Sequence, residues 1–115
     1  VFKENEFHTR RVVTAVSGSG PAYVFLLAEV LAAAAEQEGL DKDTAMRLAS
    51  RTVAGAGALM LETGETASAL RKQVTSAGGT TEAALDVLGA GDGLGPLLRR
   101  AVSAAAQRSR DLGKR

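Results

Sequence analysis

The chain has 115 residues and a mass of 11.8 kDa, which is enough for one domain and too little for two. Its 45% hydrophobic and 23% charged residues match the average of soluble globular proteins, so the composition argues against general disorder. A formal net charge of +1 argues against a general nucleic-acid binder. The chain has no cysteine and one histidine, so we expect no metal site and a reducing, cytoplasmic location.

Aromatic residues make up 3% of the chain and all lie in its first quarter. The rest of the core must therefore be built from alanine, leucine, valine and methionine. Alanine is the best helix former, and the composition predicts an all-α fold. Because a chain this short buries little of its own surface, we expect part of its apolar surface to contact a second chain.

The valine-rich run within the first twenty residues permits two interpretations. Residues 1–11 are charged and lack an initiator methionine, so we expect an internal start, with a further domain upstream. Val12 to Val16 reads either as a short strand or as the end of a helix that begins near Glu6. The Ser/Gly segment at 17–20 is expected to break whichever element precedes it.

Five helices are expected after this segment, at about 21–37, 42–63, 66–74, 80–88 and 96–112. Gly39, Gly64 and Gly113 supply stops, and Asp41 is a helix cap. The apolar run at 22–35 is too short for a membrane span of about 20 residues and contains Glu29, so a buried core helix is favoured.

Two glycines, Gly55 and Gly57, lie inside the helix expected at 42–63. Each costs about 1 kcal/mol relative to alanine in a helix interior, so the pair needs a reason. Close approach of another helix backbone is the favoured reason, and a flexible hinge is the alternative.

Gly18-Ser19-Gly20 follows a valine-rich run, which suggests the G-x-G-x-x-G pattern of a dinucleotide-binding loop. Tyr23 stands where that pattern needs a small residue, and no alternation of strands and helices follows. A tight helix-to-helix turn is therefore favoured over a nucleotide-binding protein.

A second glycine-rich segment, Val74 to Thr81, precedes an expected helix start. Unpaired amides and the helix dipole favour a carboxylate or phosphate at such a position. Ser76, Thr80 and Thr81 add hydroxyl groups to it. On the residues alone, an ordinary capped turn in which these hydroxyls bind their own backbone is favoured over an anion site. His8 and Asp92 have no catalytic partners in the sequence, so the chain holds a candidate binding loop without a complete catalytic apparatus.

The segments 14–25 and 74–81, at this spacing, resemble the C-terminal domain of the pyrroline-5-carboxylate reductases, and the similarity extends over about residues 12–112. The resemblance implies an oxidoreductase of proline biosynthesis. It implies that residues 12–115 form a multi-helix dimerisation and substrate-binding domain like the C-terminal domain of 6-phosphogluconate dehydrogenase, interlocked with a second subunit. Residues 1–11 would then end a linker from an absent N-terminal Rossmann domain.

The resemblance also implies a role for each residue of the second segment. The substrate-binding residues are Val74, Ser76, Gly78, Gly79, Thr80 and Thr81. Ser76 and the amides of Gly78, Gly79 and Thr80 would hold the carboxylate of the substrate, and Thr81 would act as the catalytic residue beside the ring nitrogen.

The cofactor and partners implied are those of the whole enzyme. NADPH or NADH would bind the absent domain, so no cofactor is expected in this chain, which alone would be inactive. The partners would be a second copy, in a dimer or a higher assembly of dimers, and a small-molecule substrate, with neither nucleic acid nor a membrane.

The family pattern differs from this sequence near the candidate loop. Proline usually stands where this chain has Ala77, and an acidic residue usually stands where it has Lys72. Two alternatives therefore remain beside the reductase: a divergent paralogue for another imine or carboxylate, and a helical oligomerisation module without catalytic function.

Overall fold

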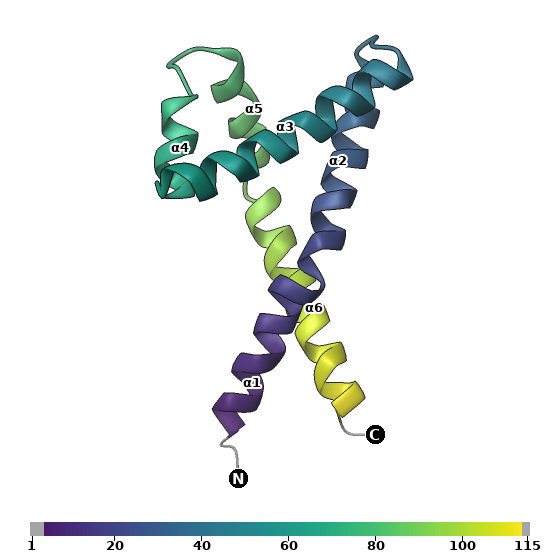
Figure 1. Ribbon diagram of the computed structural model, residues 1–115, viewed down its shortest axis with the longest axis vertical. Coiled ribbons are helices and arrows are strands. Elements are labelled where there is room, and N and C mark those ends of the chain that lie inside the picture. Colours follow the sequence, from purple (N-terminus) through teal and green to yellow (C-terminus); the bar gives the residue numbers. More distant parts are fainter. Residues whose placement is uncertain (1–3, 114–115) are drawn as a thin grey trace. The chain divides into compact units, whose positions relative to one another are not determined.

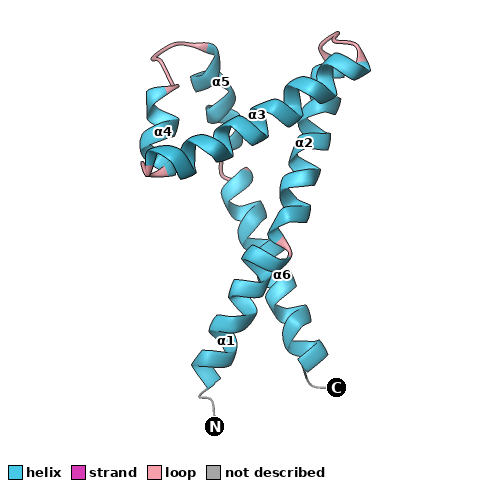
Figure 2. Ribbon diagram, in the orientation of Figure 1, coloured by secondary structure: helices cyan, strands magenta, loops and turns pink. Residues whose placement is uncertain are grey.

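The computed structural model describes residues 4–113. Within this range the chain forms six α-helices and one π turn, and no strand (Figures 1 and 2). The prediction of an all-α fold is confirmed. Residues 1–3 of the expected linker lie outside the described range. Residues 4–11 of that linker belong to a helix.

The first helical elements are α1, Glu4–Val13, a π turn at Thr14–Gly18, and α2, Gly20–Gln37. The helical alternative is therefore correct, and the strand is not. The expected break at 17–20 is also wrong, because residues 5–37 are helical apart from a bend at Ser19. The amide of Ser19 donates to Thr14 O at 2.9 Å, which is the wider spacing of a π turn.

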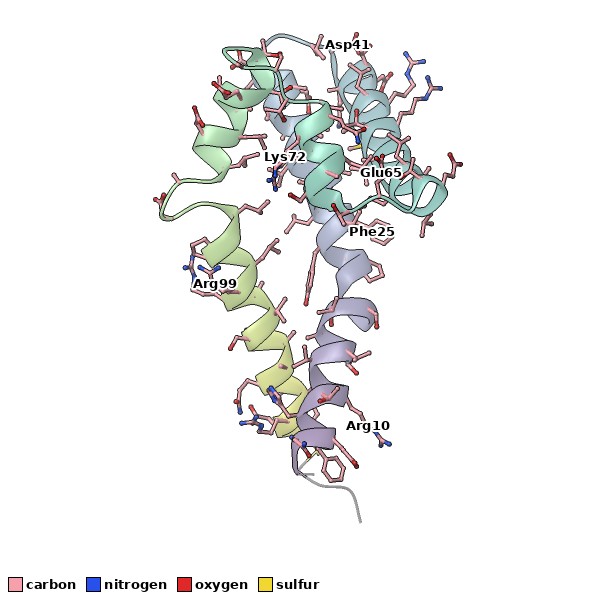
Figure 3. All side chains as sticks on the ribbon, turned by 90° about the vertical axis from the view of Figure 1, so that its left-hand side faces the viewer. Arg10, Phe25, Asp41, Glu65, Lys72 and Arg99 are labelled. Carbon is pink, nitrogen blue, oxygen red and sulfur yellow. The ribbon has the colours of Figure 1, made fainter. Side chains whose placement is uncertain are left out.

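The segment from Asn5 to Gln37 is long and apolar enough to cross a membrane by length and composition alone. We predicted a buried core helix at 22–35, and within this chain that prediction is wrong. Ala32 is the one fully buried residue of α2 in the described structure, and Phe25 is 69% exposed (Figure 3). An apolar helix with such exposure requires something else to cover it.

The turn after α2 ends that helix in the predicted way. Gly39 is left-handed, with φ of 110°. Its amide donates to Glu36 O at 3.0 Å, and the amide of Leu40 donates to Ala35 O at 3.1 Å. This pair of hydrogen bonds is a Schellman motif, which satisfies the last carbonyls of the helix and reverses the chain.

The next helix, α3, spans Lys42–Thr63 and begins at the predicted cap. Asp41 Oδ1 accepts from Thr44 N at 2.8 Å, and Asp41 Oδ2 accepts from the Thr44 hydroxyl at 2.9 Å. The helix ends at Gly64, which is left-handed with φ of 67°. The sequence therefore fixes both ends of α3 through local hydrogen bonding and backbone conformation.

The Asp41 cap makes stability depend on pH. The hydrogen bonds from Thr44, first from its amide and then from its hydroxyl, lower the pKa of Asp41. A carboxyl with a lower pKa in the folded state stabilises the protein above its unfolded pKa, and that contribution is lost as pH falls through the folded pKa. We expect the free energy of unfolding to fall below about pH 4, and to fall less in Asp41→Asn. Urea unfolding of both proteins between pH 2 and 6 measures this, and equal pH slopes would contradict it.

The chain divides into two compact units, residues 22–76 and a unit that joins residues up to 21 with those from 77 onward. In the first unit, Ala32 of α2 packs with Ala45 and Ala49 of α3, and Ala35 lies against this cluster. Methyl side chains let the two helices approach closely, but they bury little apolar area. The first unit completes with α4, Ala67–Gln73.

The second unit contains α1, the π turn, α5, Thr80–Leu88, and α6, Leu94–Gly113. Helix α6 contacts both α1 and the π turn, and Ala15 in the π turn is buried. Helical spacing puts Leu88 on the apolar face of α5 and Leu97 on that of α6, yet Leu88 is 49% exposed and Leu97 is 54% exposed. The spacing identifies the apolar face of each helix correctly but does not show what covers it.

Gly55 and Gly57 lie in the middle of α3, as predicted. A Cβ atom built on either glycine would meet nothing within 4 Å in this chain. The close approach that we predicted is therefore not made by the described part of the chain itself.

Candidate functional site

The candidate site is the segment that connects α4 to α5. Thr66 caps the start of α4, where its hydroxyl accepts from Ala69 N at 3.0 Å, and Val74 is the C-cap residue after Gln73. Helix α5 begins after Gly79, its N-cap residue. The boundary between the two compact units falls inside the segment, between residues 76 and 77.

The first part of the segment, Val74 to Ser76, continues from α4. Thr75 folds back on that helix, because its amide donates to Lys72 O at 3.2 Å and its hydroxyl donates to Arg71 O. The side chain of Val74 is 68% exposed, and Ser76 is exposed. Thr75 therefore closes the end of α4, while Val74 and Ser76 remain accessible.

The second part of the segment is a sharp bend into α5. Gly78 is left-handed, with φ of 72°, and Gly79 is extended, with φ of −87° and ψ of 179°. A Cβ atom on Gly78 would meet nothing within 4 Å, so the backbone angle and not the space requires glycine. The amides of the first residues of α5 point away from the body of the helix.

The start of α5 has no side-chain cap, because its N-cap residue is a glycine. The first hydrogen bond inside the helix runs from Ala83 N to Gly79 O at 3.2 Å. The amides of Gly79, Thr80 and Thr81 precede it, and they have no acceptor among the described residues. These amides and the positive end of the helix dipole favour an anion at this position.

Most hydroxyls of the segment do not bind the backbone in the way that the capped turn predicts. In that alternative, Ser76, Thr80 and Thr81 would bind their own backbone. Among residues 4–113, Thr75 is the residue of this segment whose hydroxyl does so. Thr80 is exposed and Thr81 is half-buried. The structure thus brings Gly78 to Thr81 together at one helix start, with two hydroxyls beside the amides.

The amide of Gly78, one of the predicted donors to the substrate, already has an acceptor in this chain. The amide of Gly78 donates to Glu82 Oε1 at 3.2 Å. The sequence prediction did not include Glu82 in the site, although an acidic residue in the first turn of a helix is well placed to accept from amides near the helix start. The side chain of Lys72, in the last turn of α4, is exposed (Figure 3).

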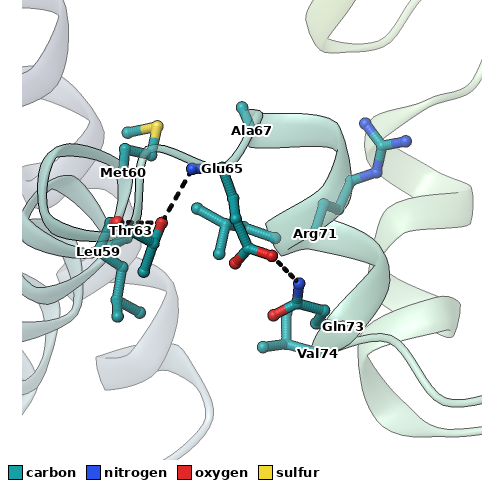
Figure 4. Close-up of a pocket in the computed structure, with 10 residues that line it drawn as sticks. Leu59, Met60, Thr63, Glu65, Ala67, Arg71, Gln73 and Val74 are labelled. Atoms are coloured by element: carbon teal, nitrogen blue, oxygen red, sulfur yellow. Dashed lines mark hydrogen bonds between the residues drawn. The ribbon is translucent and has the colours of Figure 1, made fainter.

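An apolar pocket of about 370 Å³ lies between the second half of α3 and α4, inside the unit of residues 22–76 (Figure 4). Its walls include Leu59, Met60, Leu70 and Val74. Of the predicted site residues, Val74 lines this pocket. Helical spacing places the apolar residues of α3 and of α4 on one face of each helix, but the pocket depends on how the two helices lie against each other.

Three hydrogen bonds lie at the turn beside this pocket (Figure 4). The Thr63 hydroxyl accepts from Glu65 N at 3.1 Å and donates to Leu59 O at 2.7 Å. Glu65 Oε1 accepts from Gln73 Nε2 at 2.9 Å. The turn between α3 and α4 is therefore linked to the last residue of α4, directly before Val74.

The other glycine-rich segment does not form a nucleotide site. Gly18 belongs to the π turn and Gly20 begins α2, and neither has positive φ. Helical residues precede the segment, where a dinucleotide-binding loop requires a strand. The nucleotide-binding alternative is therefore wrong for the described residues.

Comparison with known proteins gives a consistent result. A family model described as pyrroline-5-carboxylate reductase dimerisation matches residues 8–112. Pyrroline-5-carboxylate reductases of Pseudomonas aeruginosa and of Arabidopsis thaliana are each 46% identical to this chain over 102 residues. In both cases the match covers 89% of this chain and 37% of the relative. The chain therefore spans little more than a third of their length.

Solved structures give the same picture. A pyrroline-5-carboxylate reductase from Coxiella burnetii is 46% identical, with a TM-score of 0.86, and the match covers 97% of this chain and 40% of that one. A Plasmodium falciparum pyrroline carboxylate reductase, solved with NADP bound, is 29% identical with a TM-score of 0.85, and the match covers 97% of this chain and 41% of that one. Both similarities extend over nearly all of this chain.

Proposed function

Because the chain belongs to the pyrroline-5-carboxylate reductase dimerisation family, we propose that it is the dimerisation and substrate-binding domain of an enzyme that reduces 1-pyrroline-5-carboxylate to L-proline. The observation that carries this proposal is the start of α5, where the amides of Gly79, Thr80 and Thr81 follow a left-handed Gly78 and have no acceptor among the described residues. The proposed substrate carries the carboxylate that such amides bind.

The reducing cofactor is assigned to the part of the enzyme outside this chain. The described residues contain no strand and no glycine loop of the dinucleotide-binding type, so they do not fit NADPH or NADH. One of the similar structures is solved with NADP, and this chain covers 41% of it. The role of this chain is to bind and orient the substrate.

Each residue of the loop has a proposed part in that role. The amides of Gly79 and Thr80 hold the carboxylate. The Thr81 hydroxyl both donates and accepts hydrogen bonds, so it can hold a proton at the ring nitrogen. Val74 gives an apolar contact to the ring carbons.

A second copy of the chain is the proposed cover for the apolar surface. The family is named for dimerisation, and α2 exposes a series of large apolar side chains: Val24, Phe25, Leu26, Leu27, Val30 and Leu31. Glu29 interrupts this series, which makes a protein partner more favourable than lipid. We also propose a cytoplasmic location, without a nucleic-acid partner, from the net charge of +1 and the absence of cysteine.

Two measurements test the proposed function. The full-length enzyme that carries this domain should oxidise NADPH or NADH in the presence of 1-pyrroline-5-carboxylate and release L-proline. Calorimetric titration of the same enzyme with L-proline should show one site per subunit. A well-folded dimer that neither binds L-proline nor turns over would favour an oligomerisation module without catalytic function. Turnover of a different cyclic imine would favour a divergent paralogue.

A further inference from the structure

The carboxylate of Glu82 binds the amide of Gly78, which the family resemblance assigns to the carboxylate of the substrate. Its Oε1 atom accepts from Gly78 N at 3.2 Å. Glu82 is the third residue of α5, and its side chain reaches back past the N-cap residue, Gly79, to the amide of Gly78. This bond differs from a capping box, in which the third residue binds the N-cap amide and the N-cap side chain binds the amide of the third residue.

This hydrogen bond is the contact that holds the bend at Gly78. The residue is left-handed, with φ of 72°, and a Cβ atom there would meet nothing within 4 Å. No atom of the described chain therefore lies against the side of Gly78 on which a Cβ would stand. Glycine has more accessible backbone conformations than any other residue, so a bend built on Gly78 and Gly79 needs a restraint. The half-buried Glu82 supplies that restraint.

We propose that Glu82 is a positioning residue of the substrate site, an inference that rests on the proposed function. By holding the amide of Gly78, its carboxylate fixes the bend and leaves the amides of Gly79 and Thr80 as the donors to the carboxylate of the substrate. Gly78 then belongs to the frame of the site and does not contact the substrate through its amide.

The charge of Glu82 has a separate effect. The carboxylate lies at the same helix start that binds the carboxylate of the substrate, and like charges repel. Glutamine at this position keeps an oxygen acceptor for Gly78 and removes the negative charge. Glu82→Gln is therefore expected to bind the substrate at least as well as the wild type.

The test uses steady-state kinetics of the full-length enzyme. Glu82→Ala removes the restraint, and the energy of substrate binding must then also order the bend. We expect KM for 1-pyrroline-5-carboxylate to rise by about fivefold or more and kcat to change by less than about twofold, because the ordered complex is the same once formed. Glu82→Gln should have a KM equal to that of the wild type or lower.

A second variant and a control complete the test. Glu82→Asp keeps the charge and shortens the side chain by one methylene group, so it should raise KM as alanine does, and it serves where the alanine variant fails to fold. Asp86 lies one turn further along α5 and is exposed. Asp86→Ala removes a carboxylate from the same helix without touching the bend, and it should leave KM unchanged.

The outcomes separate this inference from the proposed function. A KM for Glu82→Ala or Glu82→Asp within about twofold of wild type would overturn the positioning role. A KM for Glu82→Gln raised as much as that for Glu82→Ala would also overturn it, because the acceptor oxygen would then not account for the effect. A wild-type enzyme without turnover would overturn the proposed function itself, and the inference with it.

Discussion

Replacing Thr81 with alanine in the full-length enzyme lowers kcat by about a hundredfold and leaves the dimer intact. The reason is that the Thr81 hydroxyl is the proposed group at the ring nitrogen, and a positioned proton donor or acceptor typically contributes at least this factor. Thr81 is the second residue of α5, and its side chain is half-buried at the end that opens the helix. The measurement is the initial rate of NADPH oxidation at saturating 1-pyrroline-5-carboxylate.

Thr81→Ser is the matched control for this prediction. Serine keeps the hydroxyl and loses one methyl group, so kcat should stay within about tenfold of wild type. Light scattering should give the same mass for all three proteins. Equal turnover in the alanine variant and the wild type would remove Thr81 from the proposed role.

Replacing Gly55 with leucine should convert the dimer of the full-length enzyme into monomers. A Cβ atom on Gly55 meets nothing within 4 Å in the described part of this chain. Leucine also favours the helix over glycine by about 0.8 kcal/mol or more, which keeps α3 folded. We therefore expect the disruption to come from another chain that approaches the glycine closely. Light scattering measures it as a fall to the mass of one subunit.

Gly55→Ala gives the graded control, because a single methyl group is the smallest addition to this face of α3. We expect it to weaken the dimer less than leucine does. Circular dichroism should show unchanged helix content in both variants. A full dimer mass for Gly55→Leu at micromolar concentration would contradict the close approach and would favour a hinge at Gly55 and Gly57.

The ends of most helices could be predicted from the sequence, because local chemistry determines them. Asp41 caps α3 with its own side chain, and Gly39 and Gly64 end α2 and α3 in the left-handed conformation. These features depend on a few consecutive residues. The segment 12–20 was less predictable, because valine favours strands while the neighbouring residues continue a helix, and helical continuity prevails there through a π turn.

The burial of apolar faces could not be predicted in the same way. Helical spacing placed Leu88 and Leu97 on apolar faces, yet both are about half exposed. The spacing of residues describes one helix, whereas burial depends on what packs against it. In this chain the cluster of Ala32, Ala45 and Ala49 is small, which leaves the larger side chains for another surface.

The candidate site was predictable as a segment but not in its internal bonding. Two glycines before a helix start indicate free amides, and the structure has them at Gly79 and Thr80. The sequence did not indicate that Glu82 would take the amide of Gly78, since this depends on how a flexible side chain folds back over the first turn. The pocket beside Val74 was also missed, because it requires the relative placement of α3 and α4.

The most direct measurement of the central claim is a crystal structure of the full-length enzyme with L-proline bound. The account predicts that the carboxylate of L-proline lies within hydrogen-bonding distance of the amides of Gly79 and Thr80, with the Thr81 hydroxyl beside the ring nitrogen and Glu82 still bound to Gly78. A carboxylate bound elsewhere, with the amides at the start of α5 facing only water, would contradict it.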